Sequence, residues 1–279
     1  MAVARVRDAN ALAADALTPI RETLRHMAAR ADIPPLRGLA PGLLVTDTAG
    51  WVHATEFVSG TALDDLLDTA ARRWQASPHA AAALAFKHYA YWLALPAVLG
   101  YATVRRVPLM LPSAVVVRFT ADHDEPFLQV GLAPGRTTGS PIAVAVLPTD
   151  AVLPHGPGRG IRVVPHEAAL LDELRSALMD EHLTPLLGHI RRRTHLGRRT
   201  LWGSLASGVA HGLSRAADVI PGPTTRVAEA VLASLGVADL VEIGEQPQSA
   251  ELTVQRKTCC LAFTLPQPHQ RVCTGCCIR

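Results

Sequence analysis

The sequence predicts an α+β protein with a helical N-terminal part, a small antiparallel sheet in mid-chain, C-terminal helices and a cysteine-rich metal-binding tail. Three observations predict this class. Apolar side chains recur at helical spacing in the first and last thirds of the chain. Short apolar or β-branched runs, separated by Asp, Pro and Gly, lie between them. All five cysteines lie in the last 21 residues. We expect a body over residues 1–250, with a possible substrate cleft, and a metal-binding tail over residues 251–279.

Helices are predicted where apolar periodicity coincides with boundary signals. Pro34 and Pro35 end the first helix and begin a loop over residues 32–42. Thr61 is a plausible N-cap, and Ser77-Pro78 is a typical helix start. Pro165 opens a long helix with Leu on its apolar positions. The predicted helices span residues 8–31, 61–74, 77–95, 165–194, 199–216 and 223–235.

Four short runs form the predicted antiparallel sheet: residues 115–119, 127–132, 142–147 and 161–164. A further stretch, residues 251–265, alternates partly between apolar and polar side chains. We expect it to be extended and to tie the tail to the body by strand pairing.

Composition narrows the function classes. With 49% hydrophobic and 18% charged residues the chain is too apolar to be disordered. A net charge of +3 is too small to attract nucleic acid or a membrane surface. The N-terminus carries Arg5, Arg7 and Asp8, which do not fit an export signal. The longest uncharged apolar run, residues 89–104, contains Pro96 and falls short of the ~20 residues of a bilayer span. We therefore expect a buried core helix there, no membrane span, and a cytoplasmic protein with reduced thiols.

The cysteines follow the pattern C-C-x12-C-x2-C-C. Clustered thiols in a reducing compartment favour a metal site over disulfides. Gly275 lets the chain turn so that Cys273 and Cys276 face one ion. The adjacent pair Cys259 and Cys260 suits a two-iron cluster better than one small ion, because neighbouring side chains of an extended chain point apart. Spacing alone leaves both a [2Fe-2S] cluster and a four-thiolate zinc site open.

A doublet followed by a knuckle at the C-terminus resembles the FhuF-type ferric-siderophore reductases, whose C-C-x10-C-x2-C motif holds a [2Fe-2S] cluster. Residues 201–207 (LWGSLAS), after Arg198 and Arg199, resemble a second segment of that family. The resemblance implies a [2Fe-2S] cofactor on four ligands, and a ferric siderophore, possibly of hydroxamate type, as substrate. The implied ligands are Cys259, Cys260, Cys273 and Cys276.

The tail departs from the family pattern at two points. Twelve residues rather than ten separate the two cysteine groups, and Cys277 is an additional thiol. The family pattern makes Cys277 a bystander, and the alternative is that it replaces Cys276. His269 in the longer loop suggests a Rieske-like ligand, but four cysteines are already present.

Basic residues near the ligands are candidates for raising the potential of a cluster: Arg256, Lys257, Arg271 and Arg279. A second basic stretch contains Arg191, Arg192, Arg193, His195, Arg198 and Arg199. It is either a solvated helix end or an attractor for an anionic chelate or acidic donor. His182 and His189 share a predicted helix face, where satisfied or solvent-facing histidines are expected.

The sequence has no nucleotide-binding loop and no hydrolase elbow. The resemblance implies an enzyme that passes one electron to Fe(III) in an imported siderophore and releases Fe(II) in the cytoplasm, and this chemistry needs no catalytic acid, base or nucleophile. The donor is expected to be a reduced ferredoxin, a flavin or a flavin reductase. The alternative is a non-redox siderophore-binding or interaction module with a structural four-thiolate zinc tail. An iron–sulfur sensor is a third hypothesis, but the sequence has no clear DNA-binding helix pair.

Overall fold

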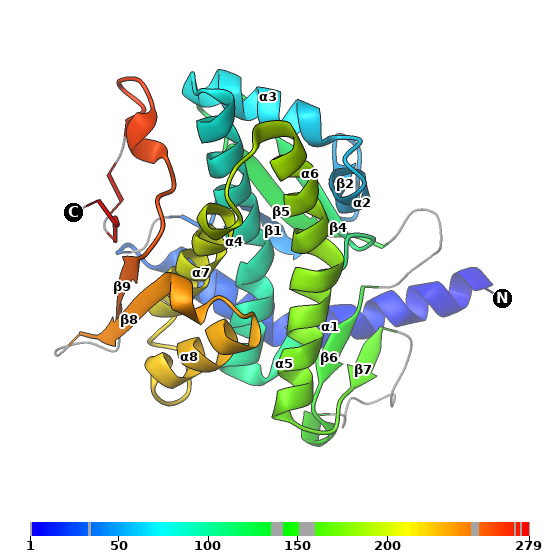
Figure 1. Ribbon diagram of the computed structural model, residues 1–279. Coiled ribbons are helices and arrows are strands. Elements are labelled where there is room, and N and C mark those ends of the chain that lie inside the picture. The colour runs from blue at the N-terminus through cyan, green and yellow to red at the C-terminus, as the bar shows by residue number, and fades with distance from the viewer. Residues whose placement is uncertain are drawn as a thin grey trace.

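The computed structural model describes residues 2–32, 35–134, 142–150, 160–246, 251–270, 272–273 and 275–278, with side chains from residue 12 onward and without that of residue 150. It confirms the α+β class: helices surround a long central helix, and short strands form small sheets beside it (Figure 1). The N-terminal helix and the cysteine tail extend on opposite sides of this view.

The central helix is α4, Pro78–Val104. Ser77 caps its start, because the Ser77 Oγ accepts from the Ala80 N–H at 3.4 Å. The predicted end near residue 95 was wrong, since the helix continues through Pro96 for two further turns. Packing on several sides keeps it helical, with α7 (Arg198–Arg215), α3 (Leu63–Trp74) and α1 (Ala2–Ala29) against it. The apolar run is a buried core helix, as predicted.

The N-terminal helix begins earlier than predicted, at Ala2, and ends at Ala29. The expected loop over residues 32–42 was wrong in part, because β1 (Leu39–Leu44) is a strand. Gly42 and Leu43 have φ of 66° within it. The strand signal is weak in the sequence because Pro41 and Gly42 interrupt it.

The predicted antiparallel sheet was correct in part: Val115–Phe119 (β4) and Leu128–Leu132 (β5) pair antiparallel, but the four predicted runs fall into two separate sheets that also contain parallel pairs. The first has the order β1-β5-β4-β2, with β1 parallel to β5 and the other pairs antiparallel. The second has the order β3-β6-β7, with β6 and β7 parallel. The strands are β2 (Val52–His53), β3 (Arg106–Pro108), β4 (Val115–Phe119), β5 (Leu128–Leu132), β6 (Val144–Val146) and β7 (Ile161–Val163).

The long predicted helix forms as three consecutive segments: α5 (Glu167–Arg175), the π-helical η2 (Ser176–Leu183) and α6 (Thr184–Thr194). The short helical elements elsewhere are α2 (Ala54–Val58), η1 (Pro148–Asp150), η3 (Ala238–Leu240) and η4 (Ala262–Thr264). Among the described residues, no helix is both long and apolar enough to span a bilayer.

The C-terminal part begins with α7 and α8 (Thr224–Ser234), followed by the hairpin of β8 (Val241–Glu245) and β9 (Leu252–Arg256). Strand β9 packs on α7, which joins the tail to the body as expected. Of the stretch predicted to be extended, residues 251–265, only the first part is a strand, because the chain turns after Arg256 and then forms η4. The proposed boundary between body and tail lies between residues 250 and 251, at the edge of the undescribed residues 247–250, and stays a prediction.

Candidate metal centre

All five cysteines belong to the short segment that follows β9 in the chain. Cys260 and Cys276 are buried, Cys259 and Cys273 are half-buried, and Cys277 is exposed. The four ligands implied by the sequence are therefore the four less exposed thiols.

Cys260 and Cys273 meet across the tail loop, with their Sγ atoms 3.3 Å apart. Two thiolates bound tetrahedrally at about 2.3 Å from one metal lie roughly 3.8 Å from each other. A small outward shift of the pair would therefore let both bind one ion.

Cys259 precedes Cys260 in the chain and is half-buried. Burial raises the pKa of Cys259, and the charges of the neighbouring cysteines raise it further. The Leu261 N–H donates to the Cys259 Sγ at 3.2 Å, a type of bond that tunes iron–sulfur sites.

The positions of the cysteine thiols can be compared with what each of the two candidate metal centres, a [2Fe-2S] cluster and a four-thiolate zinc site, requires. Within the described part of the chain, no three Cys, His, Asp or Glu side chains converge on the position of one ion. A zinc site needs all four thiolates on one ion, whereas a [2Fe-2S] cluster takes two thiolates on each iron. The described thiols form one pair in contact, Cys260 and Cys273, which supplies two of the four thiolates that either centre requires.

Strand β9 contacts the Cys273–Cys276 knuckle through its backbone. The Arg256 N–H donates to the Gly275 carbonyl at 3.0 Å, and the Cys276 N–H donates to the Cys273 carbonyl at 3.1 Å. A Cβ at Gly275 would lie 2.1 Å from the Val254 carbonyl oxygen. Only glycine permits this approach, so the knuckle is fixed to the strand by backbone contacts.

The LWGSLAS segment is the first part of α7, and it contacts the tail directly. A Cβ at Gly203 would lie 1.8 Å from the Thr258 Oγ1, immediately before Cys259. Ser204 and Ser207 accept hydrogen bonds from the Arg256 guanidinium at 3.1 and 2.9 Å. The small residues of this segment therefore allow β9 and Thr258 to pack closely on α7, just before the first cysteine.

Two cations accompany the thiols. The Lys87 Nζ lies 3.7 Å from the Cys273 Sγ. Arg256 is only 4% exposed, and its guanidinium donates to the Thr258 carbonyl and to two serine hydroxyls, all of them neutral. Among the described residues, neither cation forms an ion pair with a carboxylate. A buried cation is costly without an anion, and thiolates at this site would supply one.

The same groups favour the thiolate form of Cys260. The hydrogen bond from Cys273 lowers the pKa of Cys260, and the charges of Lys87 and Arg256 lower it further. The bond between the two cysteines and burial raise the pKa of Cys273 correspondingly. The contact therefore favours one thiolate within the pair.

Of the predicted tuning residues, Arg256 lies beside the thiols, whereas Lys257 pairs with Glu242 at 3.2 Å. Arg271 and Arg279 lie outside the described residues. Sequence reasoning missed Lys87, which is 186 residues from Cys273 in the chain and carries no motif.

The basic stretch after η2 mainly makes contacts with other helices and loops. Arg193 pairs with Asp64 and donates to the Gly60 carbonyl at 3.1 Å, and Arg199 pairs with Asp239 at 3.1 Å. None of the stretch lines the two cavities described below. This arrangement corresponds to the helix-end interpretation.

The other candidate histidines are also held by neighbours. His182 is fully buried between the Tyr89 hydroxyl and the Met110 carbonyl, each at 2.7 Å. His189 accepts from Arg192 at 2.9 Å. His269 stacks on His123 with ring centroids 5.3 Å apart.

Two cavities meet at the thiol cluster, and both are lined by Lys87, His88 and Cys273. The first, of about 350 Å³, lies between α4 and α7. The second, of about 610 Å³, lies between α3, α4 and the tail loop, where Trp74 and His269 contribute to its wall. A molecule bound in either cavity would therefore contact Cys273.

The sequence matches no known family in a comparison with protein-family models. A search of curated proteins finds no match either.

Proposed function

We propose that this protein is a ferric-siderophore reductase whose tail holds a [2Fe-2S] cluster through Cys259, Cys260, Cys273 and Cys276. When bound, such a cluster supplies one-electron transfer. The observation that carries the proposal is the contact of Cys260 with Cys273 next to Lys87, with the buried Arg256 on the strand that leads into the cysteines. The cysteine motif resembles that of the FhuF-type reductases, which supports the same assignment.

The residues around the thiols would do two things. Lys87 and Arg256 would compensate negative charge, which grows when the centre gains an electron, and so favour the reduced form. The larger cavity would hold the chelate against Cys273, with the apolar wall of Leu84, Leu265 and Val272 beside polar groups.

The substrate step needs no proton donor or nucleophile. Fe(III) in the chelate gains one electron and becomes Fe(II), which hard anionic oxygens hold less tightly, so the metal leaves. We place this step in the cytoplasm, where an imported siderophore would be met.

A single-turnover experiment tests the activity. The anaerobic protein is reduced with dithionite, freed of excess reductant and mixed with a ferric trihydroxamate and a chromogenic Fe(II) chelator. We expect Fe(II) to appear as the protein reoxidises, with one Fe(II) for each electron stored. The matched gallium(III) chelate, which cannot be reduced, should leave the protein reduced. Failure of the ferric chelate to reoxidise the protein would overturn the proposal.

A further inference from the structure

The smaller cavity has a composition that the proposed chelate site does not explain. Its walls carry three cationic side chains, Lys87, Arg215 and Arg256, and two adjacent aromatic side chains, Tyr91 and Trp92. None of its described lining residues is Asp or Glu. A cavity with several cations and no carboxylate favours an anion, and aromatic walls favour a flat ring.

The three cations act on the same space. His211, an exposed residue that also lines the cavity, has its pKa lowered by desolvation of its ring and by the charges of Lys87, Arg256 and Arg215. All three cations therefore bear on the same imidazole.

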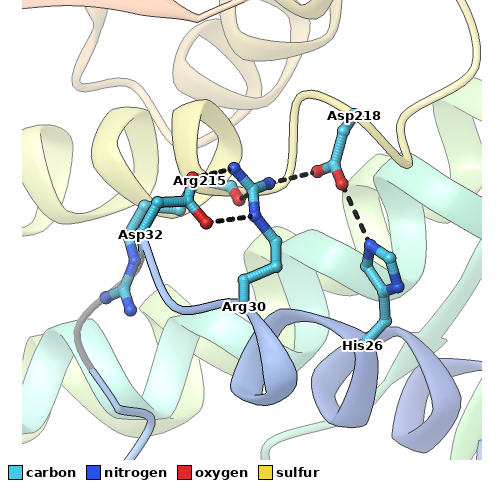
Figure 2. A network of polar contacts seen from close by, with 5 residues as sticks. All are labelled: His26, Arg30, Asp32, Arg215 and Asp218. Atoms are coloured by element: carbon cyan, nitrogen blue, oxygen red, sulfur yellow. Dashed lines mark hydrogen bonds and ion pairs between the residues drawn. The ribbon is translucent and has the colours of Figure 1, made fainter.

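Arg215 is held in position from two sides. Its backbone carbonyl accepts from the Arg30 Nη1 at 3.4 Å, and Arg30 is in turn fixed by Asp218 at 2.7 Å and Asp32 at 2.5 Å (Figure 2). Its own Nη1 donates to the Tyr91 hydroxyl at 2.8 Å. The end of α1 thus anchors the cation that stands beside the aromatic wall.

The aromatic wall is also fixed. Tyr91 and Trp92 pack edge to face with centroids 4.7 Å apart. A Cβ at Gly208 would lie 3.3 Å from the Tyr91 ring, so α7 packs closely on this side. Such a wall offers a preformed surface to a planar ligand.

We propose that this cavity binds flavin mononucleotide, a flat aromatic ring system that carries a phosphate, and that its reduced form is the electron donor. A volume of about 350 Å³ is at the lower end of the range for small-molecule sites and is far too small for a protein donor. The ring would stack on one of these two aromatic side chains, whose planes are 75° apart, and the phosphate would bind the cations. The donor role rests on the proposed function, whereas binding of the flavin does not.

The electrons balance for this donor. Reduced flavin mononucleotide loses two electrons and two protons and becomes oxidised flavin. Two ferric chelates each gain one electron, and the two protons pass to solvent. One flavin therefore serves two chelates, and the larger cavity remains available to the chelate while the flavin occupies the smaller one.

The test is a titration of oxidised flavin mononucleotide with the full-length protein as isolated, followed by flavin fluorescence. We expect saturable quenching, because a flavin stacked on an aromatic side chain loses emission. Riboflavin, which lacks the phosphate, should bind about tenfold more weakly or worse. Arg215→Gln should lower the affinity for the phosphorylated flavin about tenfold, and Arg215→Lys should recover part of it.

Arg199→Gln is the matched control, since it removes one positive charge from the other end of α7 at a site outside the cavity. It should bind the flavin like the unaltered protein. Absence of saturable quenching, equal binding of riboflavin, or equal effects of the two Arg→Gln variants would overturn the proposal.

Cluster content, measured in the same samples by visible absorption, separates this inference from the proposed function. If a colourless protein binds the flavin, the flavin site is supported, but the flavin cannot be the electron donor to a cluster. A coloured protein that transfers electrons to the ferric chelate but binds no flavin would keep the reductase and overturn the site.

Discussion

Gly203 in α7 lies directly against Thr258, the residue before the first cysteine, so closely that a Cβ at position 203 would be 1.8 Å from the Thr258 Oγ1. This contact joins the LWGSLAS segment to the metal-binding tail across 55 residues of sequence. The position of Cys259 therefore depends on a residue in the body of the protein.

Gly203→Ala should reduce the amount of cluster bound, because Thr258 must move and Cys259 with it. We expect the bound iron to fall severalfold while the far-UV circular dichroism stays close to that of the unaltered protein. Gly188→Ala is the control: it is also a helical glycine, but its nearest neighbour beyond the adjoining helix backbone is an Arg192 nitrogen at 3.6 Å. That variant should keep its iron and gain about 0.5–1 kcal/mol of helix stability. Equal loss of iron in both variants would contradict the idea that the Gly203–Thr258 contact positions Cys259.

Cys260→Ser should abolish or shift the visible cluster bands, because Cys260 is a buried thiol in contact with Cys273. Cys277→Ser should leave the bands intact, because Cys277 is exposed. Absorption and circular dichroism in the visible region measure both. Loss of colour in Cys277→Ser with retention in Cys276→Ser would transfer the fourth ligand to Cys277.

Arg256→Gln should lower the reduction potential of the centre, since it removes a buried positive charge that favours the reduced form. A change on the order of 50–100 mV is expected, because 59 mV corresponds to about 1.4 kcal/mol for one electron. Lys257→Gln is the adjacent control, because Lys257 pairs with Glu242. An anaerobic redox titration measures both variants, and an equal shift in the two would contradict a specific role for Arg256.

His182 should make the fold sensitive to acid. Burial lowers the pKa of His182 to about 4, below its ordinary value of 6.5. Between these values the unfolded chain binds the proton more readily, so stability falls as pH falls from about 6.5 toward 4. The loss attributable to this side chain is about 2 kcal/mol between pH 6.5 and 5. Chemical denaturation at the two pH values measures it, and His182→Gln should show a correspondingly smaller pH dependence. An unchanged difference in the variant would contradict this account.

The parts of the fold that the sequence predicted are those with local signals. Ser77-Pro78 marked the start of α4, and the runs of β4 and β5 were recognisable from β-branched and apolar side chains. The end of α4 was not predictable, because packing against several elements carries the helix through Pro96. The pairing of β1 with β5 depends on contacts distant in sequence and also escaped prediction.

The candidate site divides in the same way. Two of the cysteines that the motif singles out, Cys260 and Cys273, are in contact in the structure, and the full ligand set stays a prediction. Lys87 comes from α4 and Arg215 from α7, and the two cavities combine residues of α3, α4, α7 and the tail, which only the tertiary fold brings together. Adjacency in sequence also suggested Lys257, which instead pairs with Glu242.

The most direct test of the account is an anaerobic visible absorption spectrum of the purified protein, with iron, sulfide and zinc analysis before and after dithionite. The account predicts a red-brown protein with about two irons and two sulfides for each chain, bleached by dithionite. A colourless protein with about one zinc would contradict it and indicate a structural four-thiolate tail on a binding module.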